Sequence, residues 1–289
     1  MGTDPFDRSS KLRLKAIQQK ILHEILDLVP PHSACHGFRR GRSIATFAQP
    51  HLGQTVVVKL DLQDFFPSIR AIQVGAIFRF LGYPETIANL LAGLCTTITP
   101  ADVWEACAYQ ERSWGQSPQA DRYRQRHLPQ GAPTSPALAN LCAYRLDCRL
   151  AGLAATAGAN YTRYADDLAF SGQEDFRRAS RRFFTHASAI VLEEGFTVHH
   201  RKTRVMGKSV RQRLAGLVVN QTTNIPREDY DRLKATLTNC VRLGPESQNR
   251  DRHENFRAHL QGRVSFVEII NPPRGQRLRE RYENIPWPK

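Results

Sequence analysis

The sequence is poor in the features of secreted, metal-cluster or membrane proteins. It has six cysteines among 289 residues, and no two of them are spaced as Cys-x-x-Cys. This argues against a zinc ribbon and against a small disulfide scaffold, so we expect reduced cysteines in or near the core. No apolar run is long enough to span a membrane, and the N-terminus lacks a charged-then-apolar secretory pattern. We therefore expect a cytoplasmic protein with no membrane partner.

Acidic residues are also scarce. The chain has 41 Lys and Arg against 27 Asp and Glu, for a net charge of +14. From Arg201 to the end, 19 basic residues stand against 9 acidic ones, so +10 lies in the last 89 residues. A basic region of this kind suits nucleic acid, because each phosphate contact releases condensed counterions. The alternative is a solvated basic surface.

Hydrophobic spacing predicts an α+β fold, because strands and helices interleave without a regular βαβ order. Helices are expected at 12–29, 71–81, 84–95, 136–150, 176–194, 225–244 and 256–267. Strands are expected at 55–62, with opposite faces at alternate residues, and as a hairpin at 161–171. The polar, irregular residues 99–127 indicate an inserted segment.

Three aspartates stand out in this acid-poor chain. Asp61 ends the strand expected at 55–62, and Asp166 and Asp167 lie at the tip of the expected hairpin. Carboxylates at strand ends and turn tips can converge, and they then repel one another unless a cation neutralises them. Mg²⁺ does this with one or two carboxylates plus substrate phosphates. Two aspartates in a turn are common by themselves, so the assignment of a metal site depends on the surrounding motifs.

Three motifs surround these aspartates in a definite order. They are VKLDLQDFFPSI at 58–69, LPQGAPTSPALAN at 128–140 and YTRYADDL at 161–168. In this order they resemble palm motifs A, B and C of bacterial reverse transcriptases, most closely the retron type. The resemblance implies a right-hand polymerase architecture. We expect an N-terminal helix and fingers at 1–54, a palm with further fingers elements at 55–224, and a basic helical thumb at 225–289.

The resemblance also implies metal-binding and catalytic roles. Asp61 and Asp166 would ligate two Mg²⁺ ions, for which Mn²⁺ can substitute, with Asp167 in support. The backbone carbonyl of Leu62 would complete one metal shell. Lys202 lies in a segment that resembles motif D, and it would act near the leaving pyrophosphate as a general acid. The alternative for Lys202 is a solvated lysine.

Two further motifs imply contacts with the sugar and base of a deoxynucleotide. Phe66 matches the steric gate, whose ring would collide with a 2′-OH, while neighbouring Phe65 fills a core role. Gln130 and Gly131 match the residues that line the nascent base pair, where glycine allows close approach. The alternatives are a core phenylalanine and a plain Pro/Gly turn.

The loop GFRRGRSI at 37–44 matches the finger segment that clamps the triphosphate. We favour Arg39 and Arg42 there, because the planar guanidinium holds phosphate oxygens. Lys59, on the same face of its strand as Asp61, could also reach a phosphate. The alternative is that the arginines contact the template backbone or are solvated.

The segment RLAGLVVN at 213–220 resembles the primer-grip hairpin, in which Leu214, Ala215, Gly216 and Leu217 would hold the primer. The basic helices after it would follow the template–primer backbone. Retron enzymes usually carry Val-Thr-Gly where this chain has Leu-Ala-Gly, and an Asn-Ala-x-x-His signature is missing. These departures put the branched RNA–DNA product of retrons in doubt and leave the polymerase assignment intact.

We therefore expect an RNA-directed DNA polymerase that extends a primer 3′-OH, or a priming RNA 2′-OH, with dNTPs. Its partners would be an RNA template, a DNA or RNA primer and a dedicated noncoding RNA. It would act in a retron or antiphage defence system, whose effector protein the sequence does not identify. The chain continues only two residues past Trp287, so we expect no maturase or endonuclease region. The alternative is a non-catalytic RNA-binding subunit, which lost aspartates would indicate.

Overall fold

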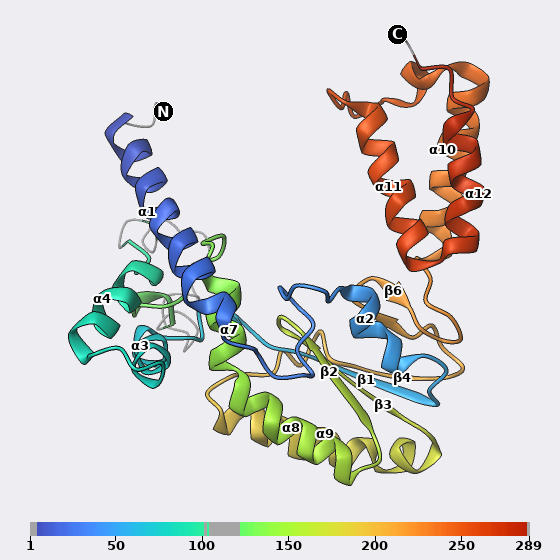
Figure 1. The fold of residues 1–289 in the computed structure, drawn as a ribbon. Coiled ribbons are helices and arrows are strands. Elements are labelled where there is room, and N and C mark those ends of the chain that lie inside the picture. Colours follow the sequence, from blue (N-terminus) through green and yellow to red (C-terminus); the bar gives the residue numbers. More distant parts are fainter. Residues whose placement is uncertain (1–4, 101–102, 104–121, 288–289) are drawn as a thin grey trace.

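The structure is a computed structural model, and it describes residues 5–100, 103 and 122–287. Helices surround a four-stranded antiparallel sheet (Figure 1), so the fold is α+β as predicted. Of the inserted segment expected at 99–127, residues 101–102 and 104–121 lie outside the described part. No helix in the described ranges is both long and apolar enough to cross a membrane.

The sheet has the strand order β2-β3-β1-β4, and all its pairs are antiparallel. The strands are β1 (Val56–Asp61), β2 (Asn160–Tyr164), β3 (Asp167–Gly172) and β4 (Arg204–Gly207). In β1 every residue except Lys59 is buried, which fits its run of β-branched and apolar residues. β4 was not predicted, because four residues are too short for a clear alternation.

The two faces of the sheet belong to two different cores. Val58 and Leu60 pack with Phe170 in a core covered by α8 (Tyr144–Thr156) and α9 (Glu174–Glu193) below the sheet in Figure 1. Val57 points the other way, into a core shared with α2 (Ile44–Ala48) and the C-terminal helices. Side-chain alternation along the strand produces this division, and it confirms the faces assigned from the sequence.

A helical group lies to the left of the sheet in Figure 1. It consists of α1 (Pro5–Glu24), η1 (Leu26–Leu28), α3 (Ala71–Phe80), α4 (Glu85–Cys95) and α7 (Ser135–Cys142). The helices predicted at 71–81 and 84–95 are confirmed by α3 and α4. The prediction of one helix at 12–29 was wrong in its bounds. Leu12 and Ile17 are exposed, and Figure 1 shows the N-terminal end of α1 projecting beyond the neighbouring helices.

Two further helix predictions are settled by the structure. The helix expected at 136–150 is two helices, because the chain turns at Ala143 between α7 and α8. The helix expected at 176–194 is α9, which begins two residues earlier. Local apolar spacing located the helical residues but could not show the turn between two consecutive helices.

The C-terminal part is a short hairpin followed by three helices. The hairpin is β5 (Arg213–Leu214) and β6 (Leu217–Val218), and the helices are α10 (Arg227–Leu243), α11 (Phe256–Ile270) and α12 (Pro272–Glu283). α10 follows Pro226 and ends at Gly244, whose φ of +81° suits glycine. α12 was not predicted, because it begins with two prolines and has few apolar residues.

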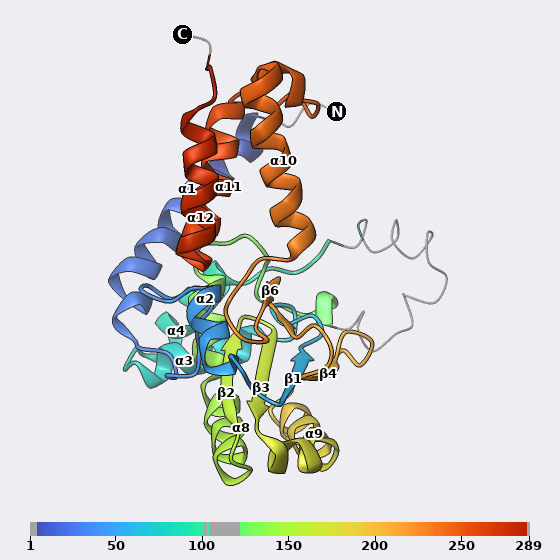
Figure 2. The same cartoon turned by 90° about the vertical axis from the view of Figure 1, so that its right-hand side faces the viewer.

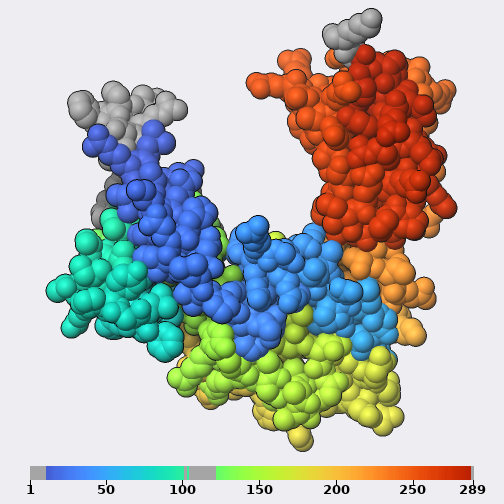
Figure 3. Space-filling view, in the orientation of Figure 1, coloured from blue at the N-terminus to red at the C-terminus, as the bar shows by residue number. Residues whose placement is uncertain are grey.

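The N-terminal and C-terminal helices stand apart on the same side of the sheet. Figure 3 shows a wide hollow between α1 and the α10–α12 group, and Figure 2 shows that group rising above the sheet. Fingers, palm and thumb are arranged in this way in a right-hand polymerase. The boundaries expected at residues 54 and 224 stay predictions.

Truncation of Leu237 should destabilise the α10–α12 group. Leu237 is fully buried in α10, whereas Leu243 in the same helix is 65% exposed. We expect Leu237→Ala to lower the free energy of unfolding by about 2–5 kcal/mol, and Leu243→Ala to change it by less than about 0.5 kcal/mol. Urea denaturation followed by circular dichroism measures both. Equal losses would contradict this packing.

Candidate active site

Three aspartates meet at one end of the two central strands. In the antiparallel pair of β1 and β3, Asp61 lies directly opposite Asp167. Residues paired in this way have Cα atoms about 4.5–5.5 Å apart. Asp166 lies in the turn between β2 and β3, residues 165–166, here called the catalytic turn, where Ala165 has a φ of +53°. The Leu62 amide donates a hydrogen bond of 2.9 Å to the Asp166 carbonyl, which ties this turn to the end of β1.

A cavity of about 440 Å³ opens beside these aspartates. Six residues selected from the sequence line it: Asp61, Leu62, Phe66, Gln130, Asp166 and Lys202. Gln63, Asp64, Phe65 and His199 complete the lining. The remaining predicted nucleotide and metal residues do not line it; they are Lys59, Asp167, Gly131, Arg39 and Arg42. Motif spacing did not single out His199, although it lies three residues before Lys202.

Two lysines pair with these aspartates. Lys59 Nζ lies 2.7 Å from Asp167 Oδ1, and Lys202 Nζ lies 3.5 Å from Asp61 Oδ1. The first pair is mostly buried, whereas the Lys202 side chain is largely exposed at the cavity edge. Asp167 is therefore held by a lysine away from the cavity, and Asp61 and Asp166 face into it.

Burial raises the pKa of both Asp166 and Asp167 above the usual aspartate range. Neighbouring carboxylates raise the pKa of Asp166 further, while Lys202 opposes that rise. For Asp167, the hydrogen bond and charge of Lys59 oppose the effect of burial. Crowded carboxylates of this kind favour a state in which a proton or a cation neutralises them.

The donor set fits a hard divalent cation. Within the described ranges, no three His, Cys, Asp or Glu side chains form a group that encloses a metal. Mg²⁺ does not need one, because it is usually held by one or two carboxylates, water and substrate phosphates. Leu62 directs its amide at Asp166, and in an extended residue the carbonyl points the same way. The carboxylates of Asp61 and Asp166 and this carbonyl are therefore the oxygens suited to the ion.

The two consecutive phenylalanines after Asp61 have different surroundings. Phe65 is buried, with its ring centroid 5.6 Å from that of Phe196, so it fills the core role. Phe66 is half-buried and lines the cavity. Gln130 also lines the cavity, and the next residue, Gly131, has a φ of +89°, a conformation that glycine adopts without strain.

The residues just before the finger loop form backbone hydrogen bonds with strand β2. His36 N–H donates to the Arg163 carbonyl at 2.7 Å, and Arg163 N–H donates to the Ala34 carbonyl at 2.8 Å. Arg39 donates a long hydrogen bond of 3.4 Å to the His32 carbonyl, and Arg42 is exposed. The loop is thus close to the catalytic turn, while its arginines lie outside the cavity.

Behind the catalytic turn lies a buried ion pair that the sequence did not predict. Arg163 and Asp147 are both fully buried, and they form two parallel hydrogen bonds of 2.8 and 2.7 Å. Arg163 Nη1 also donates to Asn140 Oδ1 at 3.0 Å and to the Ala165 carbonyl at 3.2 Å. Asn140 Nδ2 donates in turn to the Gly37 carbonyl at 2.9 Å. The catalytic turn, the motif B helix and the finger loop share this network.

One signal could have revealed this network from the sequence. In strand β2, alternation places Arg163 on the same side as Tyr161, which stacks on buried Phe170. An arginine on a buried face requires a carboxylate partner, since an unpaired charge in the interior is costly. The sequence does not show which aspartate supplies it.

The C-terminal end of the inserted segment also reaches the site. Arg122 lies 3.5 Å from Asp64 Oδ2 and donates to the Gln63 carbonyl at 3.3 Å. Tyr123 Oη donates to Asp64 Oδ1 at 3.2 Å, and burial together with the Asp64 charge raises the pKa of Tyr123 to about 12. Asp64 has a φ of +49°, so these contacts hold a residue in a strained conformation.

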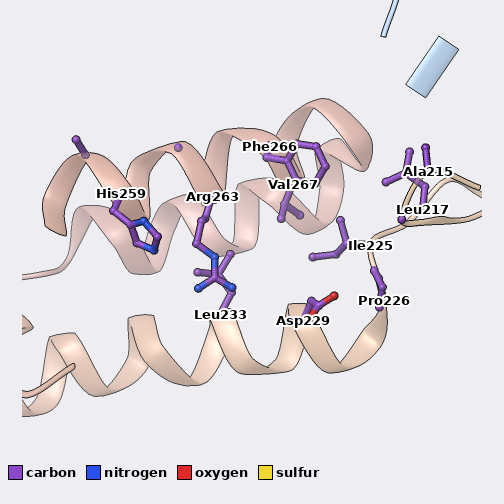
Figure 4. Close-up of a pocket in the computed structure, with 13 residues that line it drawn as sticks. Ala215, Leu217, Ile225, Pro226, Asp229, Leu233, His259, Arg263, Phe266 and Val267 are labelled. Carbon is purple, nitrogen blue, oxygen red and sulfur yellow. The ribbon is translucent and has the colours of Figure 1, made fainter. Parts of the chain in front are cut away.

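The hairpin resembling the primer grip faces the C-terminal helices. Leu214 and Leu217 are buried, while Ala215 and Gly216 form the turn with φ values of +44° and +83°. Positive φ at both turn residues is typical of a two-residue β-hairpin. Figure 4 shows this turn beside α10 and α11, where it lines a cavity of about 520 Å³ together with Phe266.

An antiparallel palm with carboxylates at the end of its central strands, between fingers and a helical thumb, defines the class of right-hand polymerases. The family model described as "Reverse transcriptase (RNA-dependent DNA polymerase)" matches residues 9–219, and the chain belongs to this family.

Three retron relatives match over almost the whole chain. The retron Mx65 reverse transcriptase of Myxococcus xanthus is 42% identical over 94% of this chain and 59% of its own length. The retron Mx162 reverse transcriptase of the same organism is 37% identical over 93% and 55%. The retron Ec86 reverse transcriptase of Escherichia coli is 32% identical over 92% and 71%. The chain therefore spans little more than half the length of the two Myxococcus relatives.

Removal of the Asn140 amide should destabilise the network behind the catalytic turn. Asn140→Ala leaves the Gly37 carbonyl and one Arg163 N–H without their partner, so we expect a loss of about 1–3 kcal/mol in the free energy of unfolding. Asn160→Ala is the matched control, because Asn160 is exposed in β2 and donates to the Pro50 carbonyl at the surface. Urea unfolding distinguishes the two; equal losses would contradict the assigned network.

Proposed function

We propose that this chain is an RNA-directed DNA polymerase that extends a primer 3′-OH, or a priming RNA 2′-OH, with deoxynucleoside triphosphates. One observation carries the proposal: Asp61, Asp166 and Phe66 line a single cavity. The carboxylates suit phosphoryl transfer, and the ring suits selection of the sugar. Membership of the reverse transcriptase family supports the same activity.

The two cavity carboxylates and the Leu62 carbonyl are assigned to metal binding. When two Mg²⁺ ions are bound, or Mn²⁺ in their place, they neutralise charge on the attacking and leaving oxygens of phosphoryl transfer. Asp167 supports the site from its ion pair with Lys59. This role for Lys59, orienting a carboxylate, differs from the phosphate contact expected from the sequence.

Lys202 is assigned to proton donation at the leaving pyrophosphate. Its ammonium lies 3.5 Å from Asp61 at the exposed rim of the cavity, where a leaving group would depart. A lysine in that place can supply both positive charge and a proton to the departing oxygen.

The triphosphate and the nascent base pair are assigned to loops around the cavity. Gln130 and Gly131 would line the base pair, and Arg39 and Arg42 would clamp the phosphates. Arg42 is exposed and Arg39 makes one long hydrogen bond, so both side chains can reorient toward a phosphate at low cost.

The hollow between fingers and thumb is assigned to the template–primer duplex. The turn at Ala215 and Gly216, between Leu214 and Leu217, would hold the primer end. The basic C-terminal helices would contact the backbone and 2′-OH groups, because A-form duplexes are recognised mainly by shape. Binding through phosphates should weaken steeply with salt.

We place this activity in a retron, because the chain's relatives are named as retron reverse transcriptases. A dedicated noncoding RNA as template, an effector protein, a role in antiphage defence and a bacterial cytoplasmic location are parts of the same proposal.

Primer extension tests the activity. On a generic RNA template annealed to a DNA primer, with Mg²⁺ and dNTPs, we expect extension by wild type and a loss of roughly 10²-fold or more with Asp166→Asn. Asp175→Asn, in a fully exposed residue of α9, should extend like wild type.

Thermal unfolding separates a catalytic loss from a folding loss. Because the pKa of Asp166 is raised, the fold disfavours its charged form, so neutral asparagine should not lower stability. If the wild type does not extend a primer either, even on RNA copurified from the host, the hypothesis of a non-catalytic RNA-binding subunit replaces that of a polymerase.

Sugar selection tests the gate. We expect Phe66→Ala to raise the efficiency of ribonucleotide relative to deoxynucleotide insertion by roughly 10–100-fold, because the ring would no longer collide with the 2′-OH. Single-nucleotide insertion of CTP and dCTP opposite template guanine gives this ratio. An unchanged ratio would rule out Phe66 as the gate.

A further inference from the structure

Phe38 is an exposed aromatic residue in an unusual backbone conformation beside the catalytic turn. Its side chain is 53% exposed, and its φ is +55°. A bulky residue in the left-handed region is a genuine outlier and costs of order 1–3 kcal/mol. Such strain persists only where the surrounding structure imposes it, so contacts of the neighbouring residues must hold Phe38 in this conformation.

The backbone before Phe38 is fixed against the catalytic turn. A Cβ on Gly37 would come within 2.6 Å of the Ala165 amide nitrogen, so only glycine allows this approach. The Gly37 carbonyl accepts the hydrogen bond from Asn140, and His36 N–H donates to the Arg163 carbonyl. The position of Phe38 is therefore set by the palm, although the residue belongs to the finger loop.

The ring of Phe38 contacts the gate residue. Its centroid lies 6.1 Å from that of Phe66, at an interplanar angle of 55°, and 6.3 Å from that of Tyr164. Phe66 also contacts Phe65, with ring centroids 5.6 Å apart, and Phe65 is itself buried against Phe196. These separations are typical of aromatic pairs in contact. The ring of Phe66 is thus restrained by the core through Phe65 and by the finger loop through Phe38.

Phe38 borders a cavity other than the one that contains the aspartates. Phe66 lines the cavity that contains the aspartates, whereas Phe38 lines a second cavity of about 400 Å³ together with Arg39 and Arg40. Without the Phe38 ring, Phe66 would have free space beside it. A gate that rejects a 2′-OH by collision works only while its ring cannot yield, since a side chain free to leave its rotamer does so at small cost.

We propose that Phe38 is a positioning residue for sugar selection: it holds the ring of Phe66 in place and so sets how strongly ribonucleotides are rejected. The proposal rests on the proposed function of Phe66 as the gate. Phe38 acts through Phe66, without touching the nucleotide itself.

Insertion of CTP and dCTP by a set of variants tests this proposal. Phe38→Ala should raise the efficiency of ribonucleotide relative to deoxynucleotide insertion by roughly 3–10-fold, the size of one aromatic pair interaction. Phe38→Gly should do the same, because glycine removes the ring and also relieves the backbone strain. Phe38→Tyr keeps the ring and should restore the wild-type ratio. Phe80→Ala is the control, because Phe80 is 87% exposed on α3 and lies outside the site.

A double-mutant cycle then shows whether Phe38 acts through the gate. If it does, Phe38→Ala should add nothing to the change already caused by Phe66→Ala. Additive effects, or an equal loss of insertion with both nucleotides, would overturn the proposal and indicate a separate contact with substrate or template.

The result for Phe66→Ala alone distinguishes failure of the role proposed for Phe38 from failure of the gate assignment of Phe66. If that variant changes the ratio while Phe38→Ala does not, only the role of Phe38 is lost. If Phe66→Ala leaves the ratio unchanged, the gate assignment fails and the role of Phe38 fails with it.

Discussion

The buried ion pair between Arg163 and Asp147 holds the parts of the site in register. Neither charge could remain in the interior alone, because removal of one partner from such a pair costs about 3–5 kcal/mol. Two further N–H groups of the Arg163 side chain donate to Asn140 and to the carbonyl of Ala165, inside the catalytic turn. Asn140 extends the network to Gly37 in the finger loop. One buried side chain therefore connects the turn that carries Asp166 to the finger loop.

In front of this network, the charges of the site are balanced unequally. Lys59 neutralises Asp167 in a mostly buried pair, whereas Lys202 approaches Asp61 from solvent at a longer distance. Burial raises the pKa of Asp166, and repulsion from the carboxylates of Asp167 and Asp61 raises it further. Of these three adjacent acids, Asp167 is fixed by a buried lysine, whereas Asp61 and Asp166 face the cavity.

The sheet that carries the aspartates also packs against the C-terminal helices. One face of the sheet, with Val57 and Ala169, belongs to the same core as Leu237 in α10 and Val264 in α11. The hairpin at 213–218 lies between them, and its turn borders a cavity with α10 and α11. The C-terminal helices therefore pack against the same face of the sheet that carries Asp61 and Asp167.

The sequence by itself determined the motif order, the two faces of β1, the catalytic hairpin and the positions of α3, α4, α9, α10 and α11, because each depends on residues near in the chain with a clear period or turn signal. The tertiary structure alone decided which charges pair. Asp147 meets Arg163 from another element, Lys59 is engaged by Asp167, and Arg39 turns to a backbone carbonyl outside the cavity. It also decided that the apolar stripe of α1 is partly exposed and that Phe38 touches Phe66. The physical reason is that pairing and burial depend on distances between elements remote in the chain, which local spacing does not encode.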